Sequence, residues 1–196
     1  MMSANMVQAL QQRQFHDSEW VHSLLHRFAD YYFVALDAYE SDPQRAPLVW
    51  QVAHNATQKS NVWAIQTLLL GVNAHINYDL VLALVDVLKP EWSSLDESQR
   101  DQRHDDHDRV NTIIAATIDD VQDDILEPAM PFMEFIDDVF GRLDERLISN
   151  LISHWRDNVW DHATQILRLE GTAGRQEVIA NVERDALKIG RMIYRG

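Results

Sequence analysis

Apolar residues recur along most of the chain at intervals of three and four residues, the period of an α-helix with one buried face. The clearest stripe begins near the N-terminus and consists of Trp20, Leu24, Phe28, Tyr31 and Ala35. No segment shows the convincing alternation of apolar and polar residues that is typical of a half-buried β-strand. The pattern therefore predicts an all-α fold.

Proline, glycine and capping residues divide this pattern into six or seven helices. The clearest start signal is Asp96 followed by Gln99, which is the spacing of a capping box. The predicted helices cover about residues 17–39, 48–58, 60–88, 96–126, 132–140, 142–169 and 176–193. Because the sequence shows no repeat, low-complexity linker or domain boundary, we expect one compact domain over residues 1–196, with a flexible segment at residues 1–15.

The composition is that of a folded, acidic protein. The chain has 46% hydrophobic residues, no cysteine, and 31 Asp and Glu against 17 Lys and Arg, which gives a net charge of -14. This charge disfavours binding to nucleic acid and to anionic membranes. Polar residues between 73 and 79 interrupt the longest apolar run, and no signal peptide is visible, so we expect a cytoplasmic protein without membrane spans. The expected partners are a small molecule and a second copy of the chain.

The chemically most informative segment is residues 68–80, where polar side chains interrupt an apolar helix. His75 and Asp79 lie four residues apart, on one helical face. Three apolar residues are predicted to share this face and turn the pair inward, namely Leu68, Val72 and Leu82. Asp79 is then placed to orient His75 and raise its basicity, as in a general base. The alternative is a buried pair that only fixes packing.

The neighbours of this pair add to the interpretation. Asn73 and Tyr78 are candidates for substrate binding, because they lie within one and a half turns of His75 and Asp79. Gly71 lies one turn before His75, and a glycine inside a helix costs about 1 kcal/mol relative to alanine. Its absent side chain leaves room for a neighbouring backbone or for a ligand.

The helix predicted at residues 96–126 carries a second polar cluster. Its downstream stripe consists of Ile114, Ile118, Val121 and Ile125. Projected backward at helical pitch, this stripe passes through His107 and close to Asn111, which makes both candidate catalytic residues. Asp105 and Asp106 fall outside the stripe and are expected to be solvated. The alternative is an exposed, charged helix start, where carboxylates suit the positive end of the helix dipole.

The helix predicted at residues 142–169 supplies three further candidates for substrate binding. Arg156 could neutralise a buried Asp79 or hold an anionic group with its planar guanidinium. Trp160 shares a neighbouring face, and His162 falls near the middle of the apolar stripe. Two ordinary roles are the alternatives: an ion pair of Arg156 with an exposed carboxylate, and a core histidine with one hydrogen-bond partner.

These residues carry a resemblance to a known family. The matching segments are Leu70–Leu80, the acidic stretch that ends at Asp108-Arg109-Val110-Asn111, and Arg156 with Trp160 and Ala163. Together they resemble the uncharacterised proteins grouped as domain of unknown function 5995, over roughly residues 20–169. The resemblance implies a mostly helical fold and brings no established activity with it.

A more local similarity links Gly71-x-x-x-His75-x-x-x-Asp79 to zinc-dependent phospholipase C and the related single-strand nucleases. It implies that this His and this Asp bind a metal ion. Those enzymes have another histidine ten residues after the first, where this chain has Val85, so we do not expect a trinuclear cluster. A single divalent metal bound by this pair together with His104 and Asp108 remains an alternative.

Three functions follow from these observations. The leading hypothesis is an enzyme that acts on a small, partly apolar molecule in a pocket between helices. His75 would act as acid and base or as a metal ligand, His107 and Asn111 would complete the polar wall, and Arg156 would bind an anionic group. Hydrolysis, isomerisation and elimination all fit. The second hypothesis is a non-catalytic binding protein, and the third is a structural or partner-binding helical module.

Overall fold

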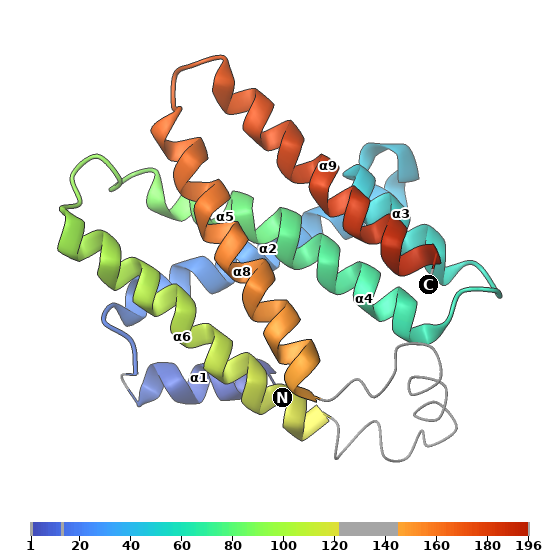
Figure 1. The fold of residues 1–196 in the computed structure, drawn as a ribbon, viewed down its shortest axis with the longest axis horizontal. Coiled ribbons are helices and arrows are strands. Elements are labelled where there is room, and N and C mark those ends of the chain that lie inside the picture. Colours follow the sequence, from blue (N-terminus) through green and yellow to red (C-terminus); the bar gives the residue numbers. More distant parts are fainter. Residues whose placement is uncertain (1, 13, 122–144, 196) are drawn as a thin grey trace. The chain divides into compact units, whose positions relative to one another are not determined.

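The computed structural model describes residues 2–12, 14–121 and 145–195 (Figure 1). Among these residues there is no β-strand, so the predicted all-α fold is confirmed. The helices are α1 (Met2–Gln11), α2 (Ser18–Ser41), the 3-10 helix η1 (Pro43–Arg45), α3 (Leu48–Thr57), α4 (Ala64–Ala74), the π-helix η2 (His75–Asp79), α5 (Leu80–Leu88), α6 (Glu97–Val121), α8 (Glu145–Arg168) and α9 (Gly174–Arg195).

The contacts between helices divide the chain into two compact units. The first unit consists of Met1–His22 and Leu95–Asp157, and the second consists of Ser23–Ser94 and Asn158–Gly196. Helices α2 and α8 each contribute residues to both units. This division does not decide whether the chain is one domain, so the single domain expected from the sequence stays a prediction.

The first unit pairs α1 with α6. Residues 1–15, which we expected to be a flexible segment, thus contain a helix, and its Met6 and Ala9 are buried. Asp106 on α6 is fully buried, so the prediction that it is solvated is wrong. Its carboxylate accepts hydrogen bonds from the backbone N–H groups of His16 (2.7 Å) and Asp17 (2.8 Å). His16 and Asp17 directly precede α2, so these bonds fix the chain on α6 where α2 begins. Helical spacing alone does not show this contact.

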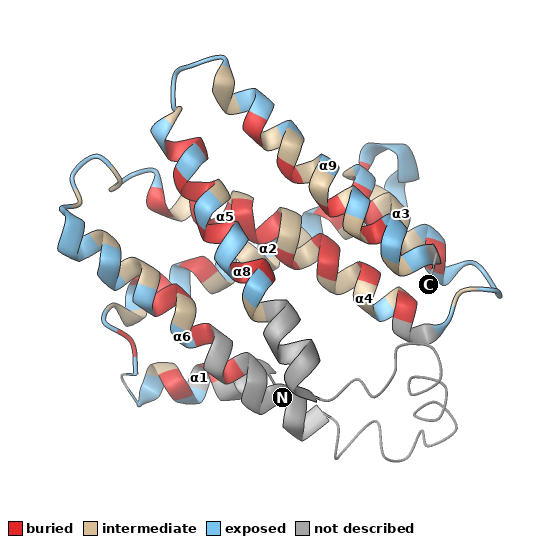
Figure 2. Cartoon of the chain, viewed as in Figure 1, coloured by how far each residue is buried: buried red, intermediate tan, exposed pale blue. Residues whose placement is uncertain are grey.

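The second unit is built on α3, α4 and α9, which pack against one another. In Figure 2 buried residues alternate with exposed ones along α9, as expected for a helix with one buried face. The core of the unit is rich in small side chains and contains Ala35, Ala46, Val49, Trp50, Ala53, Ala56, Leu70, Ala74 and Ala186. Asn73 on α4 is also buried, donates to the Ala186 carbonyl (2.9 Å) and accepts from Asn77 (3.0 Å). The buried amide therefore joins α4 to α9.

The helix predicted at residues 60–88 forms from Ala64 to Leu88, and it contains a π turn. The backbone N–H of Leu80 bonds to the carbonyl of His75, five residues earlier. A π turn holds one residue more than an α turn, which rotates the following residues by about 100°. The predicted inward face of Leu68, Val72 and Leu82 is therefore not continuous: Leu68 is 58% exposed, and the other two are partly exposed. Asp79 itself points inward and is 1% exposed.

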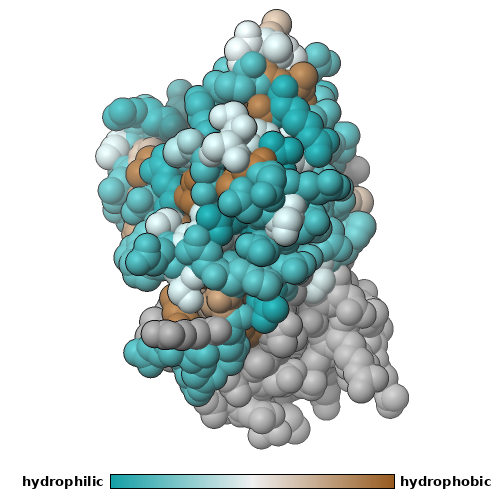
Figure 3. All heavy atoms as spheres, turned by 90° about the vertical axis from the view of Figure 1, so that its left-hand side faces the viewer, coloured by the Kyte–Doolittle hydropathy of each residue, from teal (hydrophilic) through white to brown (hydrophobic). Residues whose placement is uncertain are grey.

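This same helix is long and apolar enough to cross a membrane by length and composition alone. The segment Gln66–Leu88 has 23 residues and a mean hydropathy of 1.6. However, 61% of the apolar window is buried inside the protein, as in the core helix of a soluble protein, so the observation is weak evidence for a membrane span. On the face shown in Figure 3, hydrophilic residues cover most of the coloured surface.

The predicted helix boundaries can be checked at their signals. The capping box at Asp96 and Gln99 is confirmed, because each side chain bonds to the backbone N–H of the other residue, at 2.9 and 2.8 Å. The helix expected at residues 132–140 and the predicted end of the preceding helix at residue 126 lie outside the described residues.

Candidate functional site

The predicted pair of His75 and Asp79 is formed in the π turn of the second unit. The Nδ1 atom of His75 lies 3.0 Å from Oδ2 of Asp79. The indole Nε1–H of Trp50, on α3, donates to the same carboxylate and lies 3.1 and 3.0 Å from its two oxygens. A buried carboxylate thus accepts hydrogen bonds from two side chains, one on each of two helices.

Burial and hydrogen bonding shift the pKa of the Asp79 carboxyl group in opposite directions. Burial raises the pKa of Asp79 above its ordinary value, while the bonds from His75 and Trp50 oppose the rise. The hydrogen bond places a proton on Nδ1 of His75, because an ionised carboxylate is only an acceptor. Close by, burial raises the pKa of Tyr78 to about 12, with smaller contributions from Glu183 and Asp79, so this phenol stays protonated at neutral pH.

Two aromatic rings from α2 contact the imidazole of His75. The ring of Phe28 stacks on His75 with centroids 3.6 Å apart and planes 11° apart. Tyr32 meets the same imidazole edge to face at 5.8 Å. The side chain of His75 is 28% exposed, and in the described part of the chain its Nε2 atom has no hydrogen-bond partner. One nitrogen is therefore fixed by the fold and the other is available.

A hollow of about 400 Å³ lies beside this imidazole, and we call it the aromatic hollow. Helices α2, α3 and α4 and the first residue of η2 provide its lining, which consists of Tyr32, Trp50, Ala53, His54, Thr57, Thr67, Leu68, Gly71, Val72 and His75. A Cβ atom built on Gly71 would meet no other atom within 4 Å. The room predicted at this glycine is thus open space in the hollow.

The other candidates in the second unit have different surroundings. Asn73 uses both ends of its amide in bonds within the fold. Tyr78 packs against the core cluster of the unit. Trp160 is buried and His162 is partly buried, and none of these four side chains lines the aromatic hollow. Their predicted role in substrate binding stays a prediction.

The remaining candidates lie in the first unit. His107 is fully buried, as the helical pattern predicted, and burial together with the charge of Arg156 lowers its pKa to about 3. Asp108 lies 3.3 Å from His107 and 3.6 Å from His104. Arg156 is buried and donates to the backbone carbonyl of His107 (2.7 Å), and burial lowers its pKa to about 10. The side chain of Asn111 lies outside the described part of the structure.

The candidates thus form two clusters, one in each unit, and a pocket shared by both stays a prediction. Within the described residues, no group of three or more His, Asp or Glu side chains could hold a metal ion. His75 with Asp79, and His104 with Asp108, are two separate pairs in different units. The alternative of a single metal held by all four residues gains no support.

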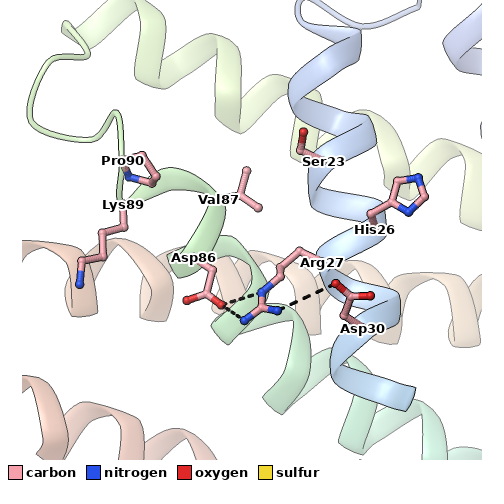
Figure 4. Close-up of a pocket in the computed structure, with 8 residues that line it drawn as sticks. All are labelled: Ser23, His26, Arg27, Asp30, Asp86, Val87, Lys89 and Pro90. Atoms are coloured by element: carbon pink, nitrogen blue, oxygen red, sulfur yellow. Dashed lines mark hydrogen bonds and ion pairs between the residues drawn. The ribbon is translucent and has the colours of Figure 1, made fainter. Parts of the chain in front are cut away.

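A second, larger hollow of about 810 Å³ lies on the second unit between α2 and α5 (Figure 4). Its central charges satisfy one another. Arg27 donates to Asp86 through Nε (2.8 Å) and Nη2 (2.6 Å), and the Tyr31 hydroxyl donates to the same oxygen (2.8 Å). Figure 4 shows Arg27 pointing toward Asp86 and Asp30. This network joins two helices and leaves the aromatic hollow as the stronger candidate site.

The sequence did not point to Trp50, Phe28 and Tyr32 as parts of the site. Trp50 and His54 are spaced by one helical turn, and their rings stack with centroids 5.3 Å apart. This spacing could have marked an aromatic face on the short helix α3. The contact between this aromatic face and His75 is a tertiary contact, which helical periodicity does not reveal.

No curated protein and no solved structure matches the chain. The model of a family of unknown function, DUF5995, matches residues 1–196, the whole chain, so the protein belongs to this family.

Proposed function

We propose that the protein is an enzyme that binds a small, partly apolar molecule in the aromatic hollow and transfers protons through His75. One observation carries this proposal. The imidazole is held on Nδ1 by the buried Asp79, while its Nε2 has no partner among the described residues and its ring lines the hollow. This arrangement suits a general base, since one nitrogen is oriented by a carboxylate and the other is available to a substrate.

Each neighbour of His75 has a distinct part in the proposal. Asp79 holds the proton on Nδ1, so that the lone pair lies on Nε2, and it stabilises the imidazolium that forms when Nε2 takes up a proton. Trp50 is a positioning residue, because its indole N–H fixes the carboxylate. Phe28 keeps the ring from rotating by stacking on its face. The proton then returns from Nε2 to the product.

The size and chemistry of the hollow support a small-molecule ligand. Its volume of about 400 Å³ falls within the range of about 300–1,000 Å³ that is common for ligand pockets. Most of its lining is apolar or aromatic, and His75 stands among these side chains as an oriented polar group. Such a composition binds through contact area and orients through few polar atoms.

The same lining favours a second candidate, a non-catalytic binding protein. Besides His75, the lining side chains with polar atoms are Tyr32, Trp50, His54, Thr57 and Thr67. The Trp50 indole N–H already donates to Asp79, and the Thr57 hydroxyl already donates to a backbone carbonyl (2.7 Å). Few groups are therefore placed to stabilise charge that develops in a reaction. Turnover separates the two candidates.

The experiment is a turnover screen with small aromatic esters, epoxides and β-hydroxy ketones, which covers hydrolysis, isomerisation and elimination. We expect activity on one class that falls about 100-fold or more in His75→Ala, the size of effect that general-base catalysis supplies. Asp79→Asn should lower the same activity, and His26→Ala, a change at an exposed histidine, should not. Equal activity of His75→Ala and wild type would contradict the proposal, and binding without turnover would favour the second candidate.

A second experiment tests whether the hollow is the binding site. Gly71→Leu places a side chain into open space and replaces a poor helix former with a good one, so the fold should be kept while the hollow is filled. Gly190→Ala is the control, because its Cβ would contact Leu70 and Asn73 at ordinary distances outside the hollow. Ligand binding and turnover should be lost in the first variant and kept in the second.

A further inference from the structure

We infer that the ligand of the aromatic hollow carries an organic cation, such as a substituted ammonium group, attached to an apolar body. This inference names the substrate class of the proposed site and therefore rests on the proposed function. It is drawn from the ring geometry of the lining, from the charges absent from it, and from the carboxylates behind it.

The first observation is a set of inclined aromatic rings. Tyr32, Trp50 and His75 lie with centroids 5.3, 5.8 and 6.1 Å apart and with mutual angles of 64°, 66° and 58°. These distances leave no space for a ligand between the rings, so a ligand in the hollow contacts the parts of the three rings that line it. The faces of aromatic rings are the negative ends of their quadrupoles and attract cations.

The second observation is the absence of a permanent positive charge among the described residues of the lining. Among the described residues that line the hollow, none is Lys or Arg. His54 does not supply a positive charge at neutral pH either, because burial lowers its pKa, with a weaker opposing effect from Glu40. A carboxylate or phosphate in the hollow would lose water and meet ring faces of the same sign.

The third observation is the negative charge around the rings. The carboxylate of Asp79 lies directly behind two of them, since it accepts hydrogen bonds from both His75 and Trp50. Glu40 acts electrostatically on His54 from the surface. The chain as a whole carries a net charge of -14, which raises the local concentration of cations. Ring faces, lining and surroundings thus favour the same sign of ligand charge.

The test compares three benzyl compounds of similar size: benzyltrimethylammonium, benzyl alcohol and phenylacetate. Binding is measured by calorimetry and by ligand-observed NMR at about 0.15 M salt, where the screening length is about 8 Å and loose attraction to the acidic surface is weak. We expect the cation to bind about 3- to 30-fold more tightly than the alcohol, the range that cation–π contacts supply. Phenylacetate should bind more weakly than both.

Variants of the hollow and a control test whether the compounds bind in the hollow. Gly71→Leu should abolish binding of the cation, and Gly190→Ala should leave it unchanged. Tyr32→Leu should weaken binding of the cation more than binding of the alcohol, since it removes an aromatic ring but keeps apolar surface. Gly71→Leu also serves where loss of Tyr32 unfolds the protein, because its side chain enters open space.

The outcomes are distinct. Equal or tighter binding of the alcohol or of phenylacetate, still sensitive to Gly71→Leu, overturns the cationic ligand and leaves the proposed function standing. Binding of the cation that Gly71→Leu does not change overturns the assignment to the hollow. No binding of any of the three compounds overturns both the inference and the use of the hollow as a ligand site.

Discussion

The hydrogen bond from Trp50 to Asp79 should stabilise the fold measurably, and Trp50→Phe tests this. The substitution keeps an aromatic ring in the core but removes the Nε1–H that lies 3.0–3.1 Å from both carboxylate oxygens. Trp50 is 3% exposed and Asp79 is 1% exposed, so bulk water has little access to replace the lost donor.

The magnitude has two parts. The smaller ring leaves a cavity that costs about 1 kcal/mol. Loss of a hydrogen bond to a buried charged group costs about 1.5–3 kcal/mol. The single variant should therefore lose about 2.5–4 kcal/mol of unfolding free energy, which is a large share of the 5–15 kcal/mol or so that is typical of proteins.

A double-mutant cycle separates these parts. Asp79→Leu removes the acceptor and keeps the branched shape of the side chain, so in that background Trp50→Phe should cost only the cavity. The assay is urea unfolding followed by far-ultraviolet circular dichroism, because Trp50→Phe alters the fluorescence. A coupling free energy of about 1.5–3 kcal/mol is expected between the two sites. A coupling below about 0.5 kcal/mol, the scatter expected for independent sites, would refute the role of Trp50 as the residue that fixes the carboxylate.

Three further predictions concern charged groups. First, burial raises the pKa of Asp79 above 3.8, so the native state binds more protons than the unfolded state just above that pH. In urea titrations, the unfolding free energy of wild type minus that of Asp79→Asn should therefore fall as pH rises above 3.8. A rise in this difference would contradict the prediction. Second, Asp106→Ala should destabilise the protein by about 3 kcal/mol or more, because two backbone N–H groups lose a buried carboxylate. In the same urea assay, Asp105→Ala at an exposed position should change stability by less than about 0.5 kcal/mol, and equal effects of the two would contradict the anchoring role. Third, burial and then Asp86 raise the pKa of Tyr31 to about 12, so Asp86→Asn should lower it while burial keeps it above 10. Absorbance at 295 nm, with Tyr31→Phe as the blank, measures this shift, and an unchanged value would refute the contribution of Asp86.

The sequence predicted what depends on local periodicity and little of what depends on distant contacts. The helices follow from apolar spacing and from caps such as Asp96, and the inward position of His107 follows from the same pattern. The bond between His75 and Asp79 was predictable because one helical turn brings the two side chains together. The burial of Asp106 was not, because its partners lie about 90 residues away along the chain.

The walls of the aromatic hollow were unpredictable for the same reason. Tyr32 belongs to α2 and Trp50 to α3, so they meet His75 only when three helices pack. The sequence did carry a signal for the space itself. Gly71 is an unfavourable choice inside a helix, and the structure shows open space where its side chain would be. A residue that weakens its own helix without relieving a close contact points to a use for the space.

The π turn gives a physical reason for the position of the pair. Most of α5 is buried, including Leu80, Val81, Leu84 and Leu88, whereas Leu68 on α4 is 58% exposed beside the hollow. A continuous α-helix would keep one face direction across both segments. The extra residue in the turn changes that direction by about 100°, so that α5 turns into the core while Leu68 on α4 stays at the hollow. His75 and Asp79 are the two ends of this turn, which places the acid inside and leaves the imidazole at the opening. A local helical irregularity thus joins a core helix to the lining of the aromatic hollow, and π turns occur frequently at functional sites in proteins.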